Sequence, residues 1–214
     1  MFVDAAFEGE SRKDCRAVAE GACWAFIGNR LSLFIYGFYP EPERWRVDLS
    51  FVLLILAIVP VLYDGMPQRG KAVIYSYLYP FIAAWLLVGG FGLEYVPTDQ
   101  FGGLMLNIVI GVTGIAFSLP IGVVLALGRQ SNLPIVRILC VTFIEIIRGV
   151  PLITLLFVAA VMLSYFVPPG TNFDLLVRVL IMVTLFASGY MAEVIRGGLQ
   201  AIPNGQYEAA DAMG

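Results

Sequence analysis

The sequence contains no histidine and few charged residues. Without histidine the chain cannot carry a His-based triad or a His-ligated metal, and it lacks the most common general base at neutral pH. Charged residues make up 14% of the chain, against roughly 25% in soluble domains. The net charge is −3 and like charges form no run, which argues against a nucleic-acid surface. We therefore expect no enzyme, no catalytic residue, no metal site and no cofactor.

Apolar residues, in contrast, make up 59% of the 214 residues. A helix needs about 20 such residues to cross a bilayer core. Strands of a membrane barrel would alternate apolar and polar residues, and the apolar runs here do not alternate. The sequence therefore predicts an all-α polytopic membrane protein with about five transmembrane helices. The expected spans are Leu49–Tyr63, Ala72–Leu93, Gln100–Gly128, 149–173 and Leu175–Ile195.

Three segments leave alternatives open. Leu49–Tyr63 is short and contains Pro60, so it is either a span or a buried or re-entrant segment. One straight helix over residues 138–167 would be about 45 Å long, too long for a single span. We expect residues 134–148 to lie along the membrane interface and the span to begin near Gly149. Ala22–Tyr39 is apolar and aromatic, and either lies in the interface or packs on other helices as a loop.

Basic residues in the short loops predict the orientation, because Lys and Arg favour the cytoplasmic side. Threading five spans alternately places six bases in one set of loops and only Arg178 in the other. The six are Arg69, Lys71, Arg129, Arg137, Arg148 and Arg196. We expect the N-terminal segment outside and the C-terminal end in the cytoplasm. Cys15 and Cys23 would then lie outside, either as a disulfide or as two free thiols.

Small residues recur at intervals of four in two of the expected spans. The third span carries Gly114, Ser118 and Gly122, and the fifth carries Thr184, Ser188 and Ala192. Small side chains at this spacing let helix backbones approach closely. We interpret the pattern as packing of these two helices against protein rather than lipid.

Two similar stretches place Glu and Arg three residues apart, before a glycine. They are Glu145–Gly149 and Glu193–Gly197. Glu145 and Arg148 can share one helix face, and so can Glu193 and Arg196. Charges at a membrane edge are costly and usually have a role. The pairs are either a polar gate on a substrate path or structural ties at a helix end, and we favour the ties.

The C-terminal residues combine a turn with a short helix. Ile202–Gly205 has turn chemistry, and a helix is expected from about Gly205, with Glu208 in its first turns. Glu208–Gly214 (EAADAMG) resembles the opening of the EAA loop of permease subunits in bacterial ABC importers. Tyr190–Gly214 and Ile144–Phe157 resemble the branch of that family that takes up polar amino acids. The N-terminal half resembles the permease of a general L-amino-acid importer.

The resemblance implies a type I importer permease of the bacterial inner membrane, with residues 1–95 as an N-terminal extension and 96–214 as a truncated permease core. It implies a cytoplasmic ABC ATPase that hydrolyses ATP, a second permease subunit and a periplasmic amino-acid-binding protein as partners. ATPase-coupling contacts would come from the EAA loop, at Gly205, Glu208, Ala209, Ala210 and Gly214. The family's motif continues beyond Gly214, so we expect a fragment. The alternative is a secondary transporter or channel subunit without an ATPase.

Overall fold

The computed structural model describes residues 24–63, 68–162 and 173–214, with residues 13, 14, 17, 65 and 165 besides. Cys15 and Cys23 lie outside the described residues, so their pairing stays a prediction. The elements are helical, and the described residues form two isolated β-bridges but no strand. The chain divides into two compact units, residues 1–109 and 110–214. The expected boundary between an N-terminal extension (residues 1–95) and a permease core (residues 96–214) is not the same as this division, and it stays a prediction.

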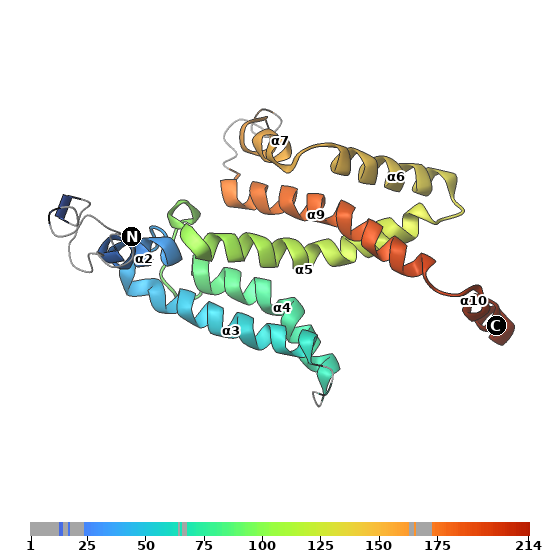
Figure 1. Ribbon diagram of the computed structural model, residues 1–214, viewed down its shortest axis with the longest axis horizontal. Helices are drawn as coiled ribbons and strands as arrows, with labels where there is room; N and C mark the ends of the chain where they lie inside the picture. Colours follow the sequence, from blue (N-terminus) through green and yellow to red (C-terminus); the bar gives the residue numbers. More distant parts are fainter. Residues whose placement is uncertain are drawn as a thin grey trace. The chain divides into compact units, whose positions relative to one another are not determined.

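The first unit contains α2 (Trp24–Tyr36), η1 (Glu41–Glu43), α3 (Arg44–Leu62), α4 (Arg69–Val88), η2 (Thr98–Gln100) and the start of α5 (Gly103–Arg129). In this unit α3 and α4 pack side by side (Figure 1). Apolar faces alone do not join them. Tyr75, Ser76 and Tyr79 of α4 donate hydrogen bonds to the carbonyls of Leu53, Ala57 and Ser50 of α3, at 3.2, 2.5 and 2.9 Å. The polar groups of the hairpin are thereby satisfied inside it, as an apolar environment requires.

The segment after α4 is shaped by glycine. Gly89 ends the helix with φ +88°, and a Cβ there would overlap the Glu94 carbonyl. Only glycine adopts this conformation without strain. The turn brings the Glu94 carbonyl within 2.7 Å of the buried Arg46 guanidinium, which also pairs with Glu43. The start of α3 therefore contains a buried arginine whose charge is matched within this unit.

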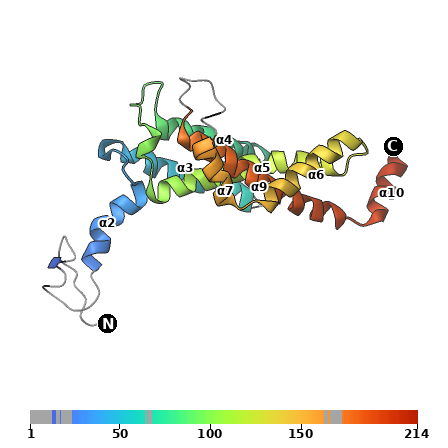
Figure 2. The same ribbon diagram turned by 90° about the horizontal axis from the view of Figure 1, so that it is seen from above.

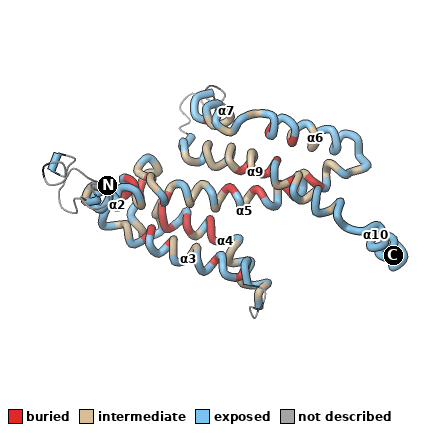
Figure 3. The backbone as a smooth tube through the Cα atoms, in the orientation of Figure 1, coloured by how far each residue is buried: buried red, intermediate tan, exposed pale blue. Residues whose placement is uncertain are grey.

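The second unit contains the rest of α5, α6 (Pro134–Gly149), α7 (Leu152–Phe157), the π-helical turn η3 (Val158–Met162), α9 (Leu175–Gln200) and α10 (Asn204–Met213). Both α6 and α7 pack against α9 (Figure 1). Most buried residues of this unit lie on α5, α6 and α9, with Ala159 of η3 besides, whereas α10 is exposed throughout (Figure 3).

The small residues of α5 and α9 lie against each other, whereas the sequence predicted only that each of these helices packs against protein. Ser118, Thr184, Ser188 and Ala192 are all buried. A Cβ on Gly122 would come within 2.7 Å of Met191 Cγ. The two serine hydroxyls donate to carbonyls of their own helices, so both are paired although they are buried. The spacing of four therefore identified a helix–helix contact.

Among the residues that the structure describes, four helices are long and apolar enough to cross a membrane, namely residues 41–62, α4, α5 and α9. A fifth span is present if α6 and Leu152–Met162 are counted together, but these are bent by 100° at Val150 and Pro151. The residue before proline avoids the helical region, and Val150 is extended. The expected all-α polytopic fold is confirmed. The helix also breaks where a change of direction was predicted, next to Gly149.

Candidate functional site

Charged side chains of three helices meet at one place in the second unit. We call Arg129, Glu145, Arg148, Glu193 and Arg196 the ion cluster. Arg129 is the last residue of α5, Glu145 and Arg148 lie in the second half of α6, and Glu193 and Arg196 lie near the end of α9. Beneath them Ala126, Ile144 and Ala192 form a buried apolar core. The ion cluster therefore covers the end of a packed three-helix contact.

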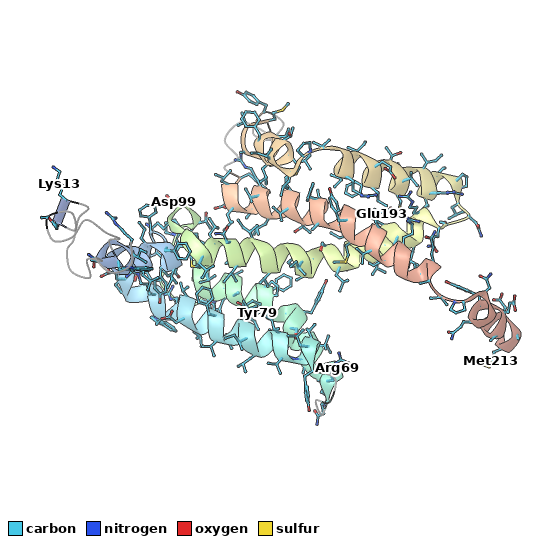
Figure 4. The ribbon with its side chains drawn as sticks, viewed as in Figure 1. Lys13, Arg69, Tyr79, Asp99, Glu193 and Met213 are labelled. Atoms are coloured by element: carbon cyan, nitrogen blue, oxygen red, sulfur yellow. The ribbon has the colours of Figure 1, made fainter. Side chains whose placement is uncertain are left out.

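Glu193 is the centre of the ion cluster (Figure 4). Its carboxylate lies 2.6 Å from Arg129, 2.8 Å from Arg196 and 3.7 Å from Arg148, and its side chain is only 16% exposed. Arg148 also lies over the ring of Tyr190, 5.7 Å from its centroid. One carboxylate thus joins α5, α6 and α9, and its partial burial makes these contacts stronger than ordinary surface pairs.

The spacing of three residues predicted two ion pairs, each within one helix. The structure contains the pair in α9, whereas both members of the α6 pair contact residues of other helices. Arg196 contacts Glu193 within α9. Glu145, in contrast, contacts Arg129 of α5 at 3.2 Å, and Arg148 reaches across to Glu193. From the sequence alone, Arg129 is expected only as one of the bases in a connecting loop. Its position at the end of a long apolar helix marked it as a membrane-edge residue, but its partners come from the register of α5 against α6 and α9.

The predicted coupling segment forms α10. Pro203 is extended and precedes the helix, so that α10 lies beyond the end of α9 in both views (Figures 1 and 2). Gly205, Glu208, Ala209 and Ala210 lie within this helix and Gly214 ends it with φ +94°; all are exposed. Tyr207 donates a 3.3 Å hydrogen bond to the Leu199 carbonyl and ties α10 to α9. The segment presents small side chains and two acids to its surroundings.

Nothing in the described residues forms a metal site, since no group of three potential ligands gathers there. Cys140 is a free cysteine, and its sulfur packs close to Gly128 of α5. The arrangement can hold helices together through charge and can present α10 to another molecule.

Comparison with known proteins identifies relatives of the chain. Residues 118–214 match the family described as binding-protein-dependent transport system inner membrane component. The inner membrane amino-acid ABC transporter permease protein YhdY of Escherichia coli is 50% identical over 99% of this chain and 58% of its own length. The glutamate/glutamine/aspartate/asparagine transport system permease protein BztC of Rhodobacter capsulatus is 43% identical over 97% of this chain and 63% of its own. The chain therefore spans about three fifths of these relatives.

A solved structure, described as an amino acid ABC transporter with histidines, is 29% identical and has a TM-score of 0.47. The match covers 52% of this chain and 51% of the chain in that structure.

Permease components of ABC importers are not enzymes, because a separate ATPase subunit hydrolyses ATP. The apolar helices and the relatives also agree on a multi-pass protein of the inner membrane. This chain is thus similar along nearly its whole length to amino-acid ABC transporter permeases, and its residues 118–214 match the family of binding-protein-dependent transport system inner membrane components.

Proposed function

We propose that the chain is part of the transmembrane permease subunit of an ATP-driven importer of L-amino acids. Two relatives that match almost all of it are described as permease proteins of amino-acid transporters. Its membrane-capable helices supply the kind of scaffold that a translocation path needs. In this proposal the protein binds no cofactor and leaves ATP hydrolysis to its partner.

The observation that carries the proposal is the exposed helix α10, directly after a membrane-capable helix. Glu208, Ala209 and Ala210 have no role in packing the described part of the chain, since all three are exposed. Small side chains let another protein approach the helix backbone closely. We infer that α10, with Gly205 before these residues and Gly214 after them, docks into a cytoplasmic ABC ATPase and transmits its movement to α9.

The partners follow from the same proposal. The permease would pair with a second permease subunit and receive its amino acid from a periplasmic binding protein. Docking of α10 to the ATPase requires a cytoplasmic C-terminal end. The excess of bases near the ends of α5 and α9 supports that orientation, with the N-terminal segment in the periplasm.

The ion cluster has a structural part in this proposal. Glu145, Arg148, Glu193 and Arg196, together with Arg129, connect three helices just before the chain turns toward α10. A movement of α10 would therefore reach α9, α5 and α6 together. We favour this tie over a gate, because four carboxylate–guanidinium contacts occupy the charged groups and hold them in place.

The test is an aspartate on the coupling helix. In the complete permease, assembled with its ATPase and partners, Ala209→Asp adds bulk and charge to the docking face. We expect amino-acid uptake into proteoliposomes to fall by about tenfold or more, as expected for an unpaired charge placed in a protein interface. ATP hydrolysis should no longer respond to the loaded binding protein.

Ala209→Ser is the matched control, because it keeps the side chain small and neutral. It should retain uptake within about twofold of the unaltered protein, as expected for an exposed conservative change. Uptake that continues at the original rate in Ala209→Asp would refute the coupling role. Uptake that needs no ATP would favour the secondary transporter or channel instead.

A further inference from the structure

A basic cleft lies beside the ion cluster in the second unit. It has a volume of about 800 Å³ and is bounded by the end of α5, the first half of α6 and the end of α9. Arg129, Arg137 and Arg196 line it, and none of its lining residues is acidic. Three guanidinium groups around one cleft favour an anion with several oxygen atoms, because arginine binds phosphate in a bidentate manner.

The charges at the cleft are not balanced by protein carboxylates. Arg129 and Arg196 share Glu193, and Arg129 also contacts Glu145. Arg137 is exposed and forms no ion pair within the described residues. With Arg148 included, four arginines face two glutamates, Glu145 and Glu193. An anion in the cleft would reduce the repulsion among these groups, and Arg137 is free to bind it.

The cleft also has an apolar side, which favours an anion with acyl chains over a free phosphate. Ile138 and Val141 of α6 line it, next to Arg137. Ile135, Ile138 and Leu139 are each more than 60% exposed. A free phosphate would gain nothing from this apolar surface, whereas a lipid has acyl chains that can cover it.

The position of the cleft agrees with a lipid. Arg129 is the last residue of α5, and Arg196 lies one turn before the end of α9, and both helices are membrane-capable. A cleft at such helix ends lies at the level of lipid head groups. Basic pockets between transmembrane helices bind anionic lipid head groups at this depth.

We propose that this cleft binds an anionic phospholipid. Arg137, Arg129 and Arg196 hold its phosphate group, and its acyl chains lie along Ile138 and the exposed apolar residues of α6. The lipid supplies the negative charge that the ion cluster lacks, and it holds α6 against the ends of α5 and α9. This inference does not depend on the transport function.

The experiment uses the whole chain, purified in mild detergent and mixed with phosphatidylglycerol or with phosphatidylcholine. Native mass spectrometry then counts the lipids that stay bound. We expect phosphatidylglycerol to be retained and phosphatidylcholine to be lost. Arg137→Gln should weaken retention of phosphatidylglycerol by about tenfold, the effect of losing one charge-assisted hydrogen bond. Arg137 is exposed, so this variant should fold.

Two variants serve as controls. Arg137→Lys keeps the charge and should retain most of the binding, while Lys71→Gln removes one positive charge at the start of α4, from a residue that does not line the cleft. Lys71→Gln should bind phosphatidylglycerol like the unaltered chain. Equal retention of the two lipids, or an unchanged Arg137→Gln, would overturn the proposal. Displacement of phosphatidylglycerol by millimolar inorganic phosphate would overturn the proposal of a bound lipid and would assign the cleft to a free phosphate.

Discussion

Glu193 is the residue on which the second unit most depends for its charge balance. It faces three guanidinium groups while largely removed from solvent. Glu193→Gln would keep the shape of the side chain but remove the carboxylate that pairs with Arg148 and Arg196, and would leave Arg129 with Glu145 alone. We expect unfolding of this unit to become easier by about 2 kcal/mol, the usual effect of breaking a partly buried, hydrogen-bonded ion pair.

Cys140 provides the measurement for Glu193→Gln. It is half-buried in α6 against α5, and changing Cys15 and Cys23 to serine leaves it as the only thiol among the chain's three. A thiol-reactive fluorophore then reports when this unit opens on heating. Glu145→Gln is the matched control, because its side chain is 56% exposed and makes one contact. Glu145→Gln should lower the free energy of unfolding by less than about 1 kcal/mol. An equal cost for both variants would contradict the central place of Glu193.

At the scale of elements, the packing of α5 on α9 depends on Gly122, which has no side chain where the two helices meet. Gly122→Leu would drive a branched side chain into Met191 and the Ala192 backbone. We expect a loss of about 2 kcal/mol, typical of overpacking in a tight contact, and earlier labelling of Cys140 on heating. Gly111→Leu lies on the same helix with nothing within 4 Å of the added Cβ. If Gly111→Leu destabilises the unit as much as Gly122→Leu does, the loss does not come from the contact with α9, because leucine is the better helix former at both positions.

Local chemistry made several elements predictable. The small residues of α5 and α9 and the Val150–Pro151 break follow from backbone sterics, which act over a few residues. Span ends were harder to place. The helix expected from Leu49 begins at Arg44, because Arg46 is neutralised by Glu43 and Asp48 accepts a 2.7 Å hydrogen bond from Tyr36. A hydropathy profile places the end of the span at such charged residues, because it does not include the ion pairs and hydrogen bonds that neutralise them.

The ion cluster marks the limit of that local reasoning. The pair within α9 could be read from its spacing, but Glu145 is drawn to Arg129, sixteen residues earlier in the chain. This choice depends on how α5 and α6 lie against each other, which no spacing within one helix specifies. The segment Ala22–Tyr39 is similar: its composition left an interfacial segment and a packed loop open, and residues 24–36 form a helix.

At the scale of the whole molecule, the distribution of basic residues predicts how the chain crosses the membrane. Six bases fall in one set of connecting segments and only Arg178 in the other. This asymmetry favours a cytoplasmic position for the richer set and hence for α10, because translocating each additional base is unfavourable. The docking of α10 to an ATPase requires the same orientation, which the distribution of bases favours independently. A test of orientation is therefore also a test of the proposed function.

Two single-cysteine variants of a chain in which the three native cysteines are serine would decide the orientation. Gln206→Cys lies on exposed α10, and Lys13→Cys is an exposed position in the N-terminal segment. A membrane-impermeant maleimide should label Lys13→Cys in spheroplasts and leave Gln206→Cys unlabelled, with the reverse in inside-out vesicles. Detergent should expose both, which controls for reactivity. Labelling of Gln206→Cys in intact spheroplasts would place α10 outside, where no cytoplasmic ATPase could reach it, and the coupling role would be lost together with the orientation.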